Sequence, residues 1–218
     1  KGYIIMNDKF TDVYLNTVNP PTRFEDLKKR FSAVADTSEQ IRNDIIEMLN
    51  ISYVDEWLAE LNYFASYSLS KTEGKADYDP EFIQHEMDEF HHRHELTKRL
   101  RELGAPVPTI PIDQFIHINS RGGEWKQELS DESNEILSNR FIEENEAIEW
   151  YTLCVEYTKQ TEDHTSYTLF KKIKEDEEQH RLDLGDLGVQ SGIFKKDVLA
   201  MPANGDVDPK LHKVIKEL

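Results

Sequence analysis

Apolar residues recur three or four positions apart in two long segments of the first half of the chain. The segment from residue 38 to about 71 contains no proline or glycine, which favours an uninterrupted helix. The second segment opens at Asp79, a predicted N-cap, with Pro80 at the first helical position, and it ends before Gly104. We therefore expect helices over residues 38–71 and 79–103.

Two more helices are predicted in the second half of the chain. The third runs from about Ser130 to about Lys159. The fourth follows an N-cap at Asp163 and extends to Leu187, where Gly188 predicts its end.

The remaining segments favour one bundle with additions at both ends. Residues 105–129 contain three prolines and two adjacent glycines and are too long for a tight turn, so we interpret them as a crossover between the second and third helices. Short helices are expected after Thr22 and after Pro209. The predicted fold class is all-α, a four-helix bundle with an N-terminal and a C-terminal extension, over residues 38–187, 1–37 and 188–218 respectively.

Each of the four helices carries a glutamate on the stripe that should face the core. In the fourth helix Glu177 and His180 continue the 3-4 spacing that begins at Phe170, and the other helices repeat this pattern. The inward polar positions of the four helices are Glu56, Glu89 with His92, Glu144, and Glu177 with His180.

These inward acids need a counter-charge. A buried carboxylate without one is disfavoured by roughly several kcal/mol, and no lysine or arginine lies on the four stripes near the acids. Two divalent cations would carry four positive charges and match the four glutamates. Carboxylate oxygens combined with imidazole nitrogens suit iron or manganese, so the six residues predict a two-metal site.

The spacing of the motifs makes this prediction more specific than a single Glu-x-x-His would be. Glu89 follows Glu56 by 33 residues, and Glu177 follows Glu144 by the same interval. Glu89 and Glu177 each belong to an Asp-Glu-x-x-His motif, and the two halves of the pattern lie 88 residues apart. The chain therefore contains two copies of one helix hairpin.

With these repeated motifs the sequence resembles the ferritin-like di-iron carboxylate bundles, in particular bacterioferritins and Dps-like ferritins. The resemblance covers roughly residues 50–187. It is carried by four motifs, which are Glu56-Trp-Leu-Ala-Glu-Leu-Asn-Tyr63, Asp88-Glu89-Phe-His-His92, Glu144-Asn-Glu-Ala-Ile-Glu-Trp-Tyr151 and Asp176-Glu177-Glu-Gln-His180. The fold it implies is the ferritin-like four-helix bundle with a long crossover.

The resemblance also implies a role for each ligand. Two of the glutamates, Glu89 and Glu177, would bridge two irons. The pair Glu56 and His92 would bind one iron, and the pair Glu144 and His180 would bind the other. Tyr63 stands where bacterioferritins keep a tyrosine beside the centre, which makes it a candidate for the catalytic set.

The implied activity is that of a ferroxidase, which oxidises Fe(II) to Fe(III) with O2 or H2O2 for iron storage or detoxification. Iron is the expected metal, with manganese or zinc as substitutes. No haem is expected, because Phe90 stands where bacterioferritins carry a haem-binding methionine. A single cysteine, Cys154, excludes the four-cysteine iron module of rubrerythrins.

Charge and composition restrict the partners. The 43 acidic against 26 basic residues give a formal charge of −17, which argues against nucleic acid and suits a shell that attracts cations. No apolar run is long enough to span a bilayer, so we expect no membrane partner and a cytoplasmic location.

The resemblance favours a homo-oligomeric cage of twelve or twenty-four chains. The alternatives are a manganese catalase or small di-iron oxidase without storage, and a helical bundle without enzymatic activity.

Several polar residues lie beside the six predicted ligands. We expect His85, His91 and His94 on the surface or behind the ligands, because they point around the helix. Asp88 and Asp176 precede their histidines by four residues, where each either orients an imidazole or is an exposed acid.

Other neighbours are expected to have simpler roles. The acids Glu60, Glu143 and Glu146 are expected on a solvated face or on an iron-entry route. Core packing is the default role of Tyr151, as it is of Tyr63. Cys154 is expected to be a small buried hydrophobe.

Overall fold

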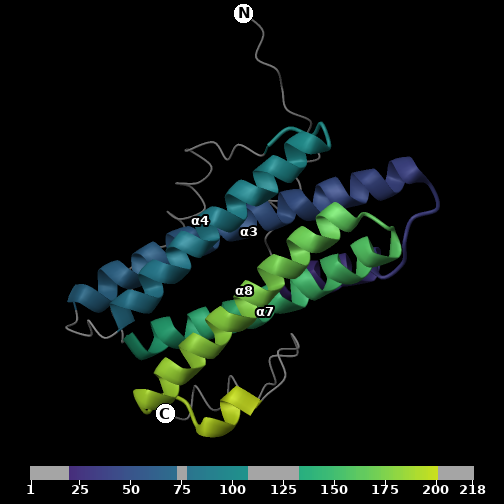
Figure 1. The fold of residues 1–218 in the computed structure, drawn as a ribbon. Coiled ribbons are helices and arrows are strands. Elements are labelled where there is room, and N and C mark those ends of the chain that lie inside the picture. The colour runs from purple at the N-terminus through teal and green to yellow at the C-terminus, as the bar shows by residue number, and fades with distance from the viewer. Residues whose placement is uncertain (1–19, 73–77, 108–132, 201–218) are drawn as a thin grey trace, which may run out of the picture.

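The computed structural model describes residues 20–72, 78–107 and 133–200 (Figure 1). Within these ranges the chain forms α-helices and one short 3-10 helix and contains no strand. The elements are α2 (Pro20–Phe31), α3 (Ser38–Thr72), α4 (Asp79–Glu102), α7 (Ser133–Gln160), α8 (His164–Gln190) and the 3-10 helix η2 (Lys196–Ala200).

The bundle consists of two antiparallel helix pairs (Figure 1). Helix α3 packs mainly on α4, and α7 packs mainly on α8, with further contacts between α4 and α8 and between α3 and α7. The all-α bundle prediction is confirmed. The predicted crossover falls mostly on residues 108–132, which lie outside the described residues, as does the short helix expected after Pro209.

A polar layer divides the core into two hydrophobic clusters. One cluster includes Leu49, Leu96, Tyr151 and Phe170, together with their neighbours on the same four helices and Phe31 of α2. The other includes Tyr63, Phe82, Phe141 and Leu184. On every one of the four long helices, the predicted ligand lies in sequence between a residue of the first cluster and a residue of the second. Both clusters therefore position the layer between them and limit its access to water.

Helix α2 covers the first cluster from outside the bundle. Phe31, at its end, makes edge-to-face contacts with the rings of Trp150 and Tyr157, at centroid distances of 6.2 and 5.9 Å. Lys28 pairs with Glu149 of α7 at 2.7 Å. The sequence predicted a helix after Thr22, and the observed helix begins at Pro20.

The ends of the helices agree with the sequence in part. Asp163 is the N-cap of α8 as predicted, and its carboxylate accepts a hydrogen bond from the Ser166 amide at 3.0 Å. The predicted N-cap at Asp79 is wrong, because Tyr78 occupies that position. The Asp79 carboxylate instead accepts a hydrogen bond from the Ser70 hydroxyl at 2.7 Å, which ties the start of α4 to α3.

Helix α8 extends past Gly188, where the sequence predicted its end. Gly188 lies inside the helix because the Phe194 ring packs on it, and a Cβ at this position would lie 2.0 Å from Phe194 Cδ2. The helix ends at Gln190, and Gly192, just after the C-cap Ser191, has a φ of 75°. The Gly192 and Ile193 amides donate to the carbonyls of Val189 and Gly188, which completes a Schellman motif.

No helix in the described ranges combines the length and the apolar character needed to cross a membrane.

The contact between Gly188 and Phe194 predicts an unfavourable Gly188→Ala substitution. Alanine favours a helix over glycine by about 1 kcal/mol, but the added methyl group overlaps the aromatic ring, and such overpacking costs about 1–3 kcal/mol. We expect a lower free energy of unfolding in urea. The matched control is Gly185→Ala, whose Cβ mainly meets the movable tip of the Leu199 side chain. A second substitution, Phe194→Leu, should recover the loss, and failure to recover it would contradict this explanation.

Candidate metal centre

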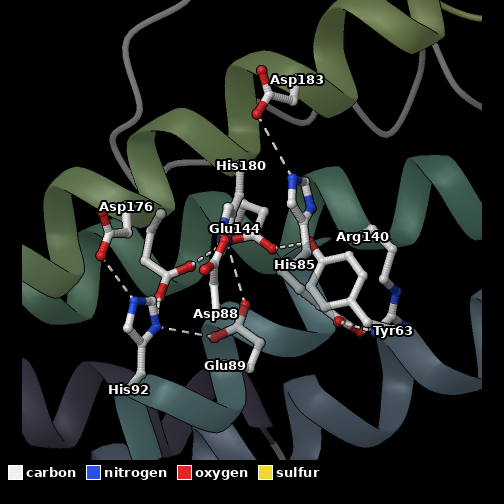
Figure 2. Close-up of polar contacts among 12 residues, drawn as sticks. Tyr63, His85, Asp88, Glu89, His92, Arg140, Glu144, Asp176, His180 and Asp183 are labelled. Carbon is white, nitrogen blue, oxygen red and sulfur yellow. Dashed lines mark hydrogen bonds and ion pairs between the residues drawn. The ribbon is translucent and has the colours of Figure 1, made fainter. Parts of the chain in front are cut away.

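The four long helices bring all six predicted ligands together in the polar layer. Helix α3 contributes Glu56, α4 contributes Glu89 and His92, and α7 and α8 contribute Glu144 and the Glu177–His180 pair. Every one of the six residues is at least 96% buried. Figure 2 shows the centre from the side, with His92 and His180 directed towards the carboxylates between the helices.

The ligand atoms form two groups that share two carboxylates. The first group is Glu56, Glu89, His92 and Glu177, and the second is Glu89, Glu144, Glu177 and His180. Within each group the ligand atoms all lie within 4.8 Å of one another. The shared residues are Glu89 and Glu177, each of which faces both histidines.

The same nitrogen of each histidine faces the carboxylates. His92 Nδ1 lies 3.0 Å from Glu56 Oε2, 3.2 Å from Glu89 Oε2 and 3.3 Å from Glu177 Oε1. His180 Nδ1 lies 3.2 Å from Glu177 Oε2 and 3.3 Å from Glu89 Oε1. Both imidazoles therefore direct one nitrogen into the centre.

The other nitrogen of each histidine faces an aspartate on the opposite helix. His92 Nε2 lies 3.1 Å from Asp176 Oδ2, and His180 Nε2 lies 3.4 Å from Asp88 Oδ2 (Figure 2). The sequence left open whether each aspartate orients an imidazole or is an exposed acid, and the structure shows that each contacts an imidazole. The two motifs face each other on α4 and α8, so each imidazole extends to the aspartate of the other motif.

Two buried tyrosines hold the two unshared glutamates. The Tyr63 hydroxyl donates a hydrogen bond to Glu144, and the Tyr151 hydroxyl donates one to Glu56. Burial and the adjacent carboxylate raise the pKa of both phenols well above the usual range, so both remain hydrogen-bond donors. Tyr151, expected only to pack in the core, therefore has the same contact as Tyr63 on the other side of the centre.

The three neighbouring histidines of α4 differ in position. His91 and His94 are exposed. His85 is 99% buried and stacks on His180 with a centroid distance of 4.0 Å, so the surface alternative is wrong for this residue. A signal for its burial was present in the sequence, because positions 82, 85, 89, 92 and 96 follow the same 3-4 spacing as the other stripes.

The remaining acids lie away from the six ligands. Glu60 pairs with Arg93 of α4 at 2.7 Å, and Glu143 pairs with Arg140 at 2.6 Å. Glu146 is exposed. Cys154 is fully buried in the first hydrophobic cluster, as expected of a small apolar residue.

Without metal, protons balance the charges of the centre. Burial, with the charges of nearby carboxylates, raises the pKa of Glu56 and of Glu144 well above the usual range. Burial alone would also raise the pKa of Glu89 and Glu177, but hydrogen bonds from the two histidines lower both values.

The pKa values of the two histidines are raised. Burial alone would lower the pKa of His92 and His180, but the surrounding carboxylates raise both values. These directions favour protons on Glu56 and Glu144 and on both imidazoles, and ionised Glu89 and Glu177, when no cation is bound.

The residues present fit a pair of divalent metal ions. The Oε1 atoms of Glu89 and Glu177 accept no hydrogen bond of good geometry from the described residues, although they are buried. A histidine nitrogen lies 3.3 Å from each of these oxygens. A buried carboxylate oxygen without a hydrogen bond is costly, and a bound cation would remove that cost. Four carboxylates with two imidazoles are also a ligand set for iron, manganese or zinc rather than for calcium or magnesium.

Comparison with known proteins gives one family and a common fold. A family model described as a ferritin-like domain matches residues 46–189. A search of curated proteins finds no significant match.

Three solved structures are similar in fold. A dodecameric thioferritin from Bacteroides fragilis, described as bacterioferritin-related, is 24% identical with a TM-score of 0.57, and the match covers 77% of this chain and 94% of that protein. The bacterioferritin of Desulfovibrio desulfuricans, described with a diiron site, is 19% identical with a TM-score of 0.60, and the match covers 78% and 95%. The Mycobacterium tuberculosis bacterioferritin BfrA is 18% identical with a TM-score of 0.55, and the match covers 77% and 95%.

The protonation of the centre predicts proton release when metal binds. Ligands must be deprotonated to bind, so two divalent ions should displace protons from Glu56, Glu144, His92 and His180, whose pKa values are all raised. We expect the release of more than one proton per chain at neutral pH, and weaker metal binding as the pH falls. Calorimetry of Zn(II) binding in buffers of different ionisation enthalpy measures this number. Glu175→Gln, an exposed position of α8, is the control. Release of one proton or none would contradict the charge assignment.

Proposed function

Because this chain belongs to the ferritin-like domain family, we propose that its six buried ligands bind two iron ions and that the protein oxidises Fe(II) to Fe(III). The observation that carries the proposal is the overlap of the two ligand groups at Glu89 and Glu177. Two metal ions that share carboxylates lie close enough to react with one oxidant molecule.

The geometry supports a distinct role for each ligand. The shared residues Glu89 and Glu177 would bridge the two ions. The unshared ligands of one ion would be Glu56 and His92. Glu144 and His180 would have the same role for the other ion.

The residues around the ligands fix their orientation. Asp176 and Asp88 accept hydrogen bonds from the outer nitrogens of His92 and His180, so that each Nδ1 would bind a metal ion once its own proton is displaced. Tyr63 holds Glu144 in a similar way. When bound, two Fe(II) ions would supply one electron each to O2 or H2O2. The protein would supply a dry, preorganised set of ligands and would release protons as the metal enters.

We also propose that the chains assemble into a shell, because iron storage needs an enclosed volume. A patch of exposed apolar side chains on the α3–α4 pair supports assembly. Ile83, Met87 and Phe90 follow one another at helical spacing on α4 and are 39–52% exposed, and Phe64 of α3 is 53% exposed. Clustered exposed apolar residues are typical of interfaces between chains. We propose that this patch contacts a second copy within a cage of twelve or twenty-four chains.

Removal of a shared ligand should abolish rapid iron oxidation. In Glu89→Ala or Glu177→Ala both ions lose a ligand, so we expect the initial rate of Fe(II) oxidation to fall at least about 100-fold. The measurement is stopped-flow absorbance of Fe(III) after Fe(II) is mixed with O2 or with H2O2. The control is His91→Ala, an exposed position on the same helix, which should leave the rate nearly unchanged. Equal losses in all three variants would contradict the assigned roles.

A charge in the α3–α4 patch should disrupt the assembly. We expect the native protein to have the mass of a cage by light scattering at neutral pH, and Met87→Glu to shift it to dimers or monomers, because a buried unpaired charge is costly. Leu182→Glu places the same charge on an exposed position of α8 and is the control. A monomeric or dimeric native protein would contradict the storage role. Iron oxidation in that case would favour the small di-iron oxidase.

A further inference from the structure

A second group of metal-ligating side chains lies next to the six ligands, on α4 and α8. It consists of Glu81 and His85 of α4 and Asp183 of α8, whose ligand atoms all lie within 4.8 Å of one another. The two acids are partly exposed, whereas the imidazole is 99% buried. None of the three belongs to the six ligands described above.

The His85 ring is held in place by aromatic contacts and not by hydrogen bonds. It stacks on His180, and the Tyr63 ring meets it edge to face at a centroid distance of 5.0 Å. Neither ring nitrogen has a hydrogen-bond partner among the described residues. A buried polar group without a partner is rare in a folded protein and calls for an explanation.

The position of Asp183 points to a bound ion. Its Oδ2 atom lies 3.7 Å from His85 Nε2, too far for a hydrogen bond (Figure 2). Two ligands about 2.1 Å from the same metal ion lie roughly 3–4 Å apart, so this separation suits a shared ion.

We propose that Glu81, His85 and Asp183 bind a third divalent transition-metal ion beside the two-metal centre. One imidazole with two carboxylates suits Fe(II), Mn(II) or Zn(II) and leaves positions open for water. The site does not depend on the six ligands, so it stands or falls independently of the proposed ferroxidase function.

The proposed ion would lie on a route from solvent to the two-metal centre. A ligand atom of His85 also lies within 4.8 Å of ligand atoms of Glu144 and His180. The Asp183 side chain is 33% exposed on the other side of the ring. An ion at this site therefore lies between solvent and the ligands of the second metal group, where it can be captured before it enters the centre.

Metal counting tests the proposal with Zn(II) as the probe. After equilibrium dialysis and elemental analysis, we expect three zinc ions per wild-type chain and two in Asp183→Asn and in Glu81→Gln. Both substitutions lie at partly exposed positions and preserve side-chain size, so the fold should be unaffected. The matched control is Asp186→Asn, an exposed aspartate three residues further along α8, which should retain three. The double variant Glu89→Gln/Glu177→Gln should retain one ion.

The outcomes separate this site from the two-metal centre. Two ions in the wild type and two in Asp183→Asn would overturn the third site and leave the centre intact. One ion in the wild type and none in Asp183→Asn would support the third site and overturn the centre. Three ions in both proteins would also overturn the proposal, because the third ion would then lie elsewhere.

Discussion

The bundle is organised around four carboxylates that share a dry interior. Four ionised glutamates at this separation would repel one another, and burial removes the water that would screen them. The centre is stable only with protons or cations between the acids. Each ligand must therefore remain in register with those of three other helices. The hydrophobic clusters on both sides of the polar layer maintain this register, because each long helix contributes residues to both of them.

The sequence predicted the bundle and the six clustered residues because both depend on local periodicity. The 3-4 spacing places Glu177 and His180 on an apolar stripe, and the repeated interval of 33 residues relates the two hairpins. The ends of the helices were less predictable. Gly188 reads as a stop signal, yet its missing side chain makes room for Phe194, six residues further along the chain. That packing depends on the path of the chain after α8, which local spacing does not determine.

The contacts between helices could not be predicted from one motif at a time. The Asp88 carboxylate faces His180 and not His92, since the pairing depends on which helices meet across the bundle. For His85 the sequence left two positions open, one on the surface and one behind the ligands, and the structure shows the second. Its position fits the buried stripe of α4, but three other histidines surround it in the sequence and two of them are exposed. The family match and the structures at 18–24% identity establish the fold, whereas the chemistry depends on the individual residues of this centre.

The shared glutamates give the centre an approximate two-fold symmetry. A rotation that exchanges the two hairpins would exchange the two ligand groups, the two tyrosine contacts and the two crossed aspartate–histidine pairs. Neither hairpin holds a complete group by itself, because each group borrows at least one glutamate from the other half. A single ancestral hairpin with these residues would assemble the centre only as a symmetric dimer. Fusion of two such copies into one chain would free each half to diverge. The group of Glu81, His85 and Asp183, which has no counterpart among the candidate metal groups of the described residues, departs from the symmetry in this way.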